Sequence, residues 1–163
     1  MQDTLITNLY QYIKENNPDV LMELEESGGV TNYLSEKVST VDSLLEQLTK
    51  ENKPAYIIEE LCMGFLTEDL RPSKYNYILG ILESEFENKY DQFIESGIVL
   101  YEVCNMIKGC QPVFDDLNFR EENEDNRFLQ SAITGVLIEY LNNVTSEIEN
   151  VGNELQQSTE TER

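Results

Sequence analysis

The sequence contains no histidine and no tryptophan, and only 11 of its 163 residues are basic. The missing histidine removes the side chain that proteins most often use as a general base and as a metal ligand. The shortage of lysine and arginine argues against direct nucleic-acid binding, because such proteins use basic side chains to displace the counterions of phosphates. The composition therefore argues against histidine-based catalysis, histidine-based metal binding and nucleic-acid binding, and it does not by itself indicate an activity.

Cysteine is also scarce. Cys62, Cys104 and Cys110 are odd in number and form no Cys-x-x-Cys pair, so neither a disulfide framework nor a zinc site is expected. Buried, reduced thiols in a cytoplasmic protein are the simpler interpretation.

No apolar run approaches the ~18 residues of a membrane-spanning helix. The first residues lack a basic segment followed by an apolar run, so no signal peptide is expected. The sequence thus predicts a cytoplasmic protein without a membrane segment.

Negative charge is abundant. The 32 acidic residues give a formal net charge of -21 and an isoelectric point near 4.1. Hydrophobic residues nevertheless make up 40% of the chain, which is enough to build a core and argues against overall disorder. We therefore expect a folded domain whose surface is strongly acidic.

Apolar residues recur every three or four positions, which is typical of amphipathic helices, and no segment alternates as a strand does. Ser73 is a plausible N-cap and Gly109 a plausible glycine just beyond a helix end. The pattern predicts an all-α, single-domain bundle of about six mostly antiparallel helices over 1–151, followed by a disordered tail over 152–163. The main helices are expected over 4–15, 31–51, 53–66, 74–86, 91–108 and 128–151, with a short one after Pro18.

The same spacing predicts which side chains face the core. The helix over 128–151 has a wide apolar stripe that begins at Phe128. The helix over 53–66 has six residues on its expected buried side: Ile57, Ile58, Leu61, Cys62, Phe65 and Leu66.

The acidic stretch from Asp115 to Asp125 is the strongest candidate for a metal site. A calcium loop needs oxygen ligands at alternating positions and glycine at the sixth. Counting from Asp115 places Leu117 third, counting from Asp116 places Arg120 fifth, and neither register has the glycine. A di-iron bundle needs histidine, which is absent. We therefore expect no metal and no other cofactor, and we interpret this stretch as a solvated loop.

The residue types give little indication of a catalytic site. A serine or cysteine nucleophile needs an activating base, and the usual one, histidine, is missing. A pair of carboxylates can hydrolyse a glycosidic bond without histidine. No spacing selects such a pair among the 32 acids, so no catalytic residue is assigned.

One part of the chain has a recognisable pattern. Its landmarks are Glu59-Glu60-Leu61-Cys62-Met63, then Leu70-Arg71-Pro72-Ser73-Lys74-Tyr75, then Ile81-Leu82-Glu83-Ser84-Glu85-Phe86. They resemble an uncharacterised all-helical family, a domain of unknown function of Bacteroides-type bacteria, often found beside genes of conjugative elements. Cys62 stands where that family has alanine. The resemblance covers about residues 5–142 and implies an all-α fold in a bacterial cytoplasm, without a catalytic residue.

Three functions remain open. The first is a non-catalytic interaction module whose acidic surface binds a basic protein partner, with encounter speeded by electrostatic attraction. The second is a DNA mimic that inhibits a DNA-binding enzyme, and the third is a carboxylate-based enzyme. Homodimerisation is compatible with all three. The candidate interaction surface consists of Asp115, Asp116, Glu121, Glu122, Glu124 and Asp125.

Overall fold

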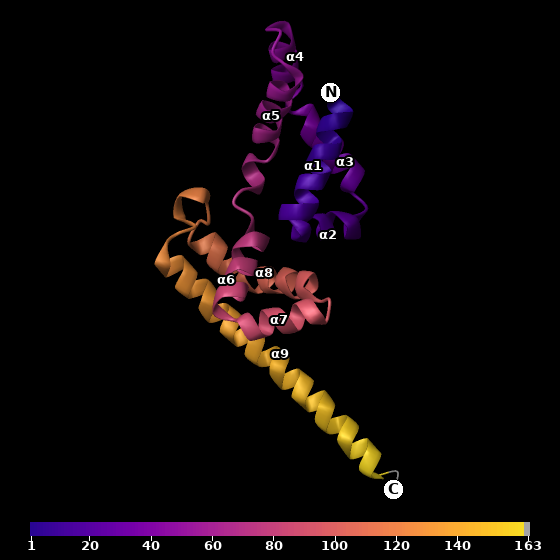
Figure 1. The fold of residues 1–163 in the computed structure, drawn as a ribbon, viewed down its shortest axis with the longest axis vertical. Helices are drawn as coiled ribbons and strands as arrows, with labels where there is room; N and C mark the ends of the chain where they lie inside the picture. The colour runs from indigo at the N-terminus through magenta and orange to yellow at the C-terminus, as the bar shows by residue number, and fades with distance from the viewer. Residues whose placement is uncertain (162–163) are drawn as a thin grey trace. The chain divides into compact units, whose positions relative to one another are not determined.

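The computed structural model describes residues 1–161, with side chains as far as Thr145. The described residues form nine α-helices, two short 3-10 helices and no strand (Figure 1). The all-α prediction is confirmed, and the expected count of about six helices is wrong. The chain divides into two compact units, Met1–Cys104 and the residues from Asn105 onward, so the structure does not support the predicted single-domain bundle.

Five helices form most of the first unit: α1 (Gln2–Asn16), α2 (Pro18–Ser27), α3 (Val30–Ser39), α4 (Asp42–Lys50) and α5 (Ala55–Leu66). Helix α1 packs against α2, α3 and α5, and α5 also contacts α4 and the 3-10 helix η1 (Glu68–Leu70) (Figure 1). The side chains buried at their centre are apolar and follow helical spacing, as in Leu5, Leu9 and Ile13 of α1. This periodicity is what the sequence predicted for the core.

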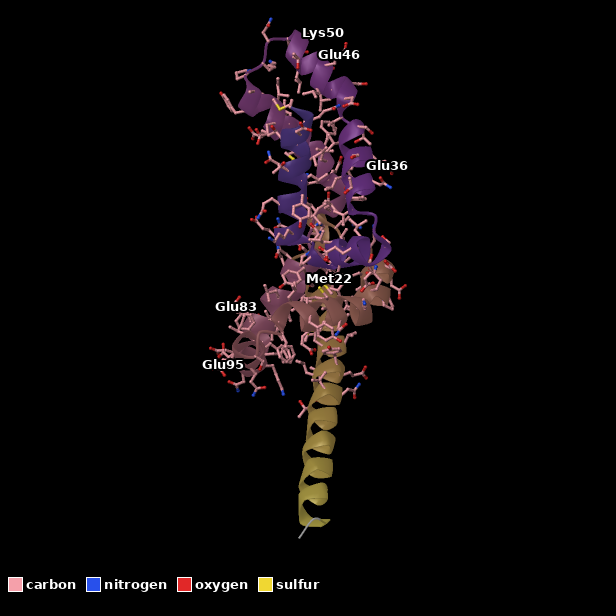
Figure 2. All side chains as sticks on the ribbon, turned by 90° about the vertical axis from the view of Figure 1, so that its right-hand side faces the viewer. Met22, Glu36, Glu46, Lys50, Glu83 and Glu95 are labelled. Carbon is pink, nitrogen blue, oxygen red and sulfur yellow. The ribbon has the colours of Figure 1, made fainter. Side chains whose placement is uncertain are left out.

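The segment over 31–51 was predicted to be one helix, and the structure divides it into α3 and α4 at Thr40 and Val41. The Thr40 hydroxyl donates to the Lys37 carbonyl at 2.6 Å, which satisfies a carbonyl at the end of α3. Val41 is buried at this corner. Helix α4 then runs to Lys50, whose ammonium lies 2.8 Å from the Glu46 carboxylate (Figure 2).

Helices α6 (Lys74–Glu85) and α7 (Glu87–Glu95) and the first residues of α8 (Val99–Asp116) complete the first unit. Gly97 has a φ of 69°, which glycine adopts without strain. Its N–H donates to the Ile94 carbonyl at 3.1 Å, and the Ile98 N–H donates to the Phe93 carbonyl at 3.0 Å. These two bonds end α7, so Gly97 marks the point at which the chain leaves α7 before α8 begins at Val99.

Ser73 caps α6, as its position after Pro72 predicted. Its Oγ accepts a hydrogen bond from the Asn76 N–H at 2.9 Å and also donates to the Asn16 carbonyl. The Asn76 side chain adds a bond to Asn16 Oδ1 at 3.1 Å. The cap therefore also joins the start of α6 to the end of α1.

Replacing Ser73 by alanine removes both hydrogen bonds of the hydroxyl. We expect Ser73→Ala to lower the free energy of unfolding by about 1–2 kcal/mol, the range for a lost N-cap. Chemical denaturation measures this loss. Ser35→Ala is the matched control, because Ser35 is exposed inside α3 and should change stability by less than about 0.5 kcal/mol. Equal stability of the two variants would contradict the cap.

A second polar corner lies at the junction of α1 and α2. The buried Asn17 donates from Nδ2 to the Leu70 carbonyl at 3.1 Å. Burial raises the pKa of the neighbouring Asp19 carboxyl, although backbone N–H groups and Lys74 act in the opposite direction. Asp19 Oδ1 is buried without a hydrogen-bond partner, so the ionised carboxylate is poorly solvated there.

A raised pKa in the folded state means that the ionised Asp19 costs stability at neutral pH. We expect Asp19→Asn to raise the melting temperature at pH 7 by about 2–4 °C, the shift that about 1 kcal/mol gives at this length. The gain should shrink as pH falls through the raised pKa, because the wild-type carboxyl then becomes protonated and neutral. Melting curves of both proteins from pH 7 to pH 4 test this expectation. A gain that grows toward low pH would contradict it.

The second unit contains the rest of α8, the 3-10 helix η2 (Glu121–Asn123) and α9 (Arg127–Thr161). The prediction that a helix ends at Gly109 is wrong, because α8 continues past Gly109 and Pro112 to Asp116. Cys110 and Phe114 are buried on this continuation, so packing outweighs the two helix-breaking residues. A Cβ at Gly109 would lie 3.9 Å from the Val136 side chain, an ordinary contact that places α8 against α9.

The predicted domain boundary at residue 151 falls within α9. Side chains beyond Thr145 and the whole of residues 162–163 lie outside the described part of the chain, so the disorder predicted for 152–163 stays a prediction. Among the residues described, no helix is both long and apolar enough to cross a membrane.

Candidate interaction surface

The candidate surface begins where α8 ends. Asn118 adopts a left-handed conformation, with a φ of 49°, and its N–H donates to the Asp115 carbonyl at 3.2 Å. The Phe119 N–H donates to the Phe114 carbonyl at 3.0 Å, and the rings of these two residues lie 4.7 Å apart. Together the bonds and the ring contact form a Schellman motif, which fixes the direction in which the chain leaves the helix.

Asn123 holds the rest of the loop in place. Its side-chain oxygen accepts from the Arg120 N–H at 2.8 Å, and its Nδ2 donates to the carbonyls of Leu117 and Asn118, each at 3.0 Å. Asn126 then caps α9 by accepting from the Leu129 N–H at 3.1 Å. The connection over 117–126 is therefore ordered, and asparagine side chains fix its backbone.

Asp115 and Asp116 are the last two residues of α8, the other four predicted carboxylates lie on the connection that follows, and all six are exposed. Asp115 accepts from Gln111 Nε2 at 2.7 Å, and Glu122 lies 3.7 Å from Arg120 in an exposed ion pair. This pair involves only one of the six carboxylates, so the surface stays negative. We call these residues the acidic loop: Asp115, Asp116, Glu121, Glu122, Glu124 and Asp125.

The acidic loop does not assemble a metal centre. No group of three or more acidic or cysteine side chains that would hold a cation occurs among the described residues. The asparagine and backbone bonds fix the main chain, while the carboxylates lie on its solvent side. The geometry presents negative charge outward, and that suits it for contact with a positively charged surface.

Phe128 is a surface residue that the sequence pattern misplaced. It was predicted to begin the buried stripe of α9, yet 71% of it is exposed, directly after the acidic loop. Leu129, Ile133 and Leu137 are buried at intervals of four. These three residues form a continuous buried stripe without Phe128. Their spacing was the one signal in the sequence that the Phe128 ring could be exposed to solvent.

All three cysteines are buried, as predicted, and none of them forms a disulfide within the described part of the chain. Burial raises the pKa of Cys62 and raises that of Cys110 to about 12. Such thiols stay protonated at neutral pH and are poor nucleophiles. Cys62 and Cys110 are therefore packing residues.

One surface hollow lies at the corner between α6 and α7. Its lining comes from a single stretch of chain, Ser84–Lys89, which includes the carboxylates of Glu85 and Glu87. Catalytic groups are usually brought together from separate elements around a reacting atom. The lining of this hollow is six consecutive residues around one corner, and we keep the acidic loop as the candidate site.

Compared with protein-family models, curated proteins and solved structures, the chain matches none.

Proposed function

We propose that this protein is a non-catalytic interaction module whose acidic loop binds a basic surface on a partner protein. The observation that carries the proposal is the combination of six exposed carboxylates with a backbone held by Asn123 and by the Phe114–Phe119 contact. A loop that is already ordered loses less conformational entropy on binding.

The carboxylates of the acidic loop and the exposed ring of Phe128 indicate the chemistry of the partner. A Lys/Arg-rich patch would neutralise the carboxylates, and a net charge of -21 would speed the encounter. Phe128 is exposed beside the loop and would serve as an aromatic anchor in an apolar pocket within that patch. The remaining expectations belong to the same proposal: a cytoplasmic location, no direct binding of nucleic acid, and membership of the helical family suggested by the sequence.

Affinity capture tests the proposal. The tagged chain is exposed to a bacterial lysate, and bound proteins are eluted with a salt gradient and identified by mass spectrometry. We expect a specific partner with a basic surface that elutes as salt rises, because screening weakens contacts between exposed charges. A partner that remains bound at high salt and does not need the acidic loop would contradict the proposal. Release of a DNA-binding enzyme by competing duplex DNA would instead favour the DNA mimic.

A further inference from the structure

Helix α5 carries two lines of apolar side chains, and the fold buries only one of them. The second line, Ile57, Leu61 and Phe65, is spaced by four residues and was predicted to face the core. The structure shows otherwise: Leu61 is 43% exposed, Phe65 is 61% exposed and Ile57 is half-buried. The line that does face the core consists of Ile58, Cys62 and Leu66.

Gly64 leaves an open position between Leu61 and Phe65. It is exposed, and a Cβ built on it would meet no atom within 4 Å, so packing in the first unit does not require glycine there. Glycine inside a helix costs about 1 kcal/mol relative to alanine. An open position flanked by two exposed apolar side chains can receive the side chain of another helix. We call Ile57, Leu61, Gly64 and Phe65 the α5 face.

Opposite charges lie at the two ends of the α5 face. Lys53 precedes the first residue of α5 by two positions, and Glu68 follows its last residue by two. Both side chains are exposed, and neither makes an ion pair within the described part of the chain. Arg71 also lies at the second end, where its guanidinium donates to the Gly64 carbonyl at 3.3 Å, so the opposite charges are those of the Lys53 and Glu68 side chains and not of the whole ends.

We propose that the α5 face is a homodimer interface on which α5 of a second copy packs antiparallel. The apolar line is symmetric about Leu61, so this arrangement places Leu61 opposite Leu61 and Ile57 opposite Phe65 of the second copy. It also places Lys53 beside Glu68 of the second copy at both ends. A twofold interface requires one surface to complement itself, and the α5 face can do so through its symmetric apolar line and through Lys53 and Glu68.

Salt distinguishes this interface from the acidic loop. Each copy has a net charge of -21, so two copies repel one another at long range. Added salt screens that repulsion, and dimerisation should strengthen from low to physiological ionic strength. Binding of a basic partner to the acidic loop should weaken over the same range, so the failure of one proposal would not imply the failure of the other.

Sedimentation velocity over a roughly hundredfold range of protein concentration tests the interface. We expect the wild-type chain to shift from monomer to dimer. Phe65→Glu should weaken dimerisation by roughly thirtyfold, as loss of a central apolar anchor does. Ile94→Glu is the matched control, because Ile94 is a comparably exposed apolar residue on α7, and this variant should dimerise as the wild type does.

Charge exchange tests the antiparallel arrangement. We expect Lys53→Glu and Glu68→Lys each to weaken the dimer and the double variant to restore it. Glu68→Lys is the more telling single change, since it lowers the net repulsion and would strengthen a dimer formed elsewhere. A wild-type chain that stays monomeric, a dimer unaffected by Phe65→Glu, or single losses that the double variant does not rescue would each overturn the proposal. Circular dichroism confirms that each variant is folded.

Discussion

Phe114→Ala should destabilise the second unit by about 3–5 kcal/mol, the usual cost of truncating a buried phenylalanine. Only 2% of Phe114 is exposed, and its ring meets that of Phe119 at the end of α8. Truncation removes buried apolar area and also the ring contact of the Schellman motif. The acidic loop should therefore lose its fixed backbone along with the stability of the unit.

Hydrogen exchange measures this effect locally. Amides of α8 and α9 and of the connection over 117–126 should exchange faster in Phe114→Ala than in the wild type. Phe128→Ala is the matched control, because it removes the same side chain from an exposed position in the same unit and should cost less than about 0.5 kcal/mol. Unchanged protection of the loop in Phe114→Ala would show that the ring contact does not hold it.

Leu9→Ala should have the corresponding effect in the first unit, a loss of about 2–5 kcal/mol. Leu9 is completely buried on α1, the helix that packs against α2, α3 and α5. Few neighbours can relax toward a cavity at the centre of such packing, so the cost should lie in the upper part of that range.

Leu61→Ala is the control for Leu9→Ala. It makes the same change on the exposed side of α5 and should leave the stability of the monomer nearly unchanged. Denaturation at low protein concentration keeps any dimer from contributing. A loss in Leu61→Ala as large as that in Leu9→Ala would mean that the α5 face is buried in solution.

Local chemistry made some features of the fold predictable. Ser73 was identified as a cap because a side-chain acceptor can reach a backbone N–H only three positions further on. Helical periodicity likewise predicted the all-α class. Each of these features depends on neighbours in sequence.

Features that depend on distant packing were not predictable. The course of α8 through Gly109 and Pro112 depends on the burial of Cys110 and Phe114, which outweighs local propensity. Periodicity identified the apolar line of α5 but not which part of it the fold covers, so Phe65 was placed in the core incorrectly.

The acidic loop was identified from its run of carboxylates, because charge density is visible in a sequence. Its order was not predictable, since it depends on bonds from Asn123 to the carbonyls of Leu117 and Asn118. A left-handed asparagine after a helix, with aromatic residues on both sides of the turn, was the available signal for that order.

The most direct test of the acidic loop as a binding surface compares two variants of equal charge. One replaces Glu121, Glu122, Glu124 and Asp125 by their amides; the other replaces Glu26, Glu36, Glu83 and Glu95, of which the last three are labelled in Figure 2. Each loses four carboxylates, which changes the net charge from -21 to -17. A difference in binding between the two variants therefore reflects where the carboxylates lie and not the total charge.

The measurement is quantitative mass spectrometry of proteins captured from one lysate by the two variants and the wild type. We expect the loop variant to lose its basic partner by about tenfold or more, while the control variant retains it nearly in full, because contact charges contribute more than distant ones. Equal retention by both variants, or equal loss from both, would contradict the account, since the acidic loop would then be no more important for binding than the rest of the acidic surface.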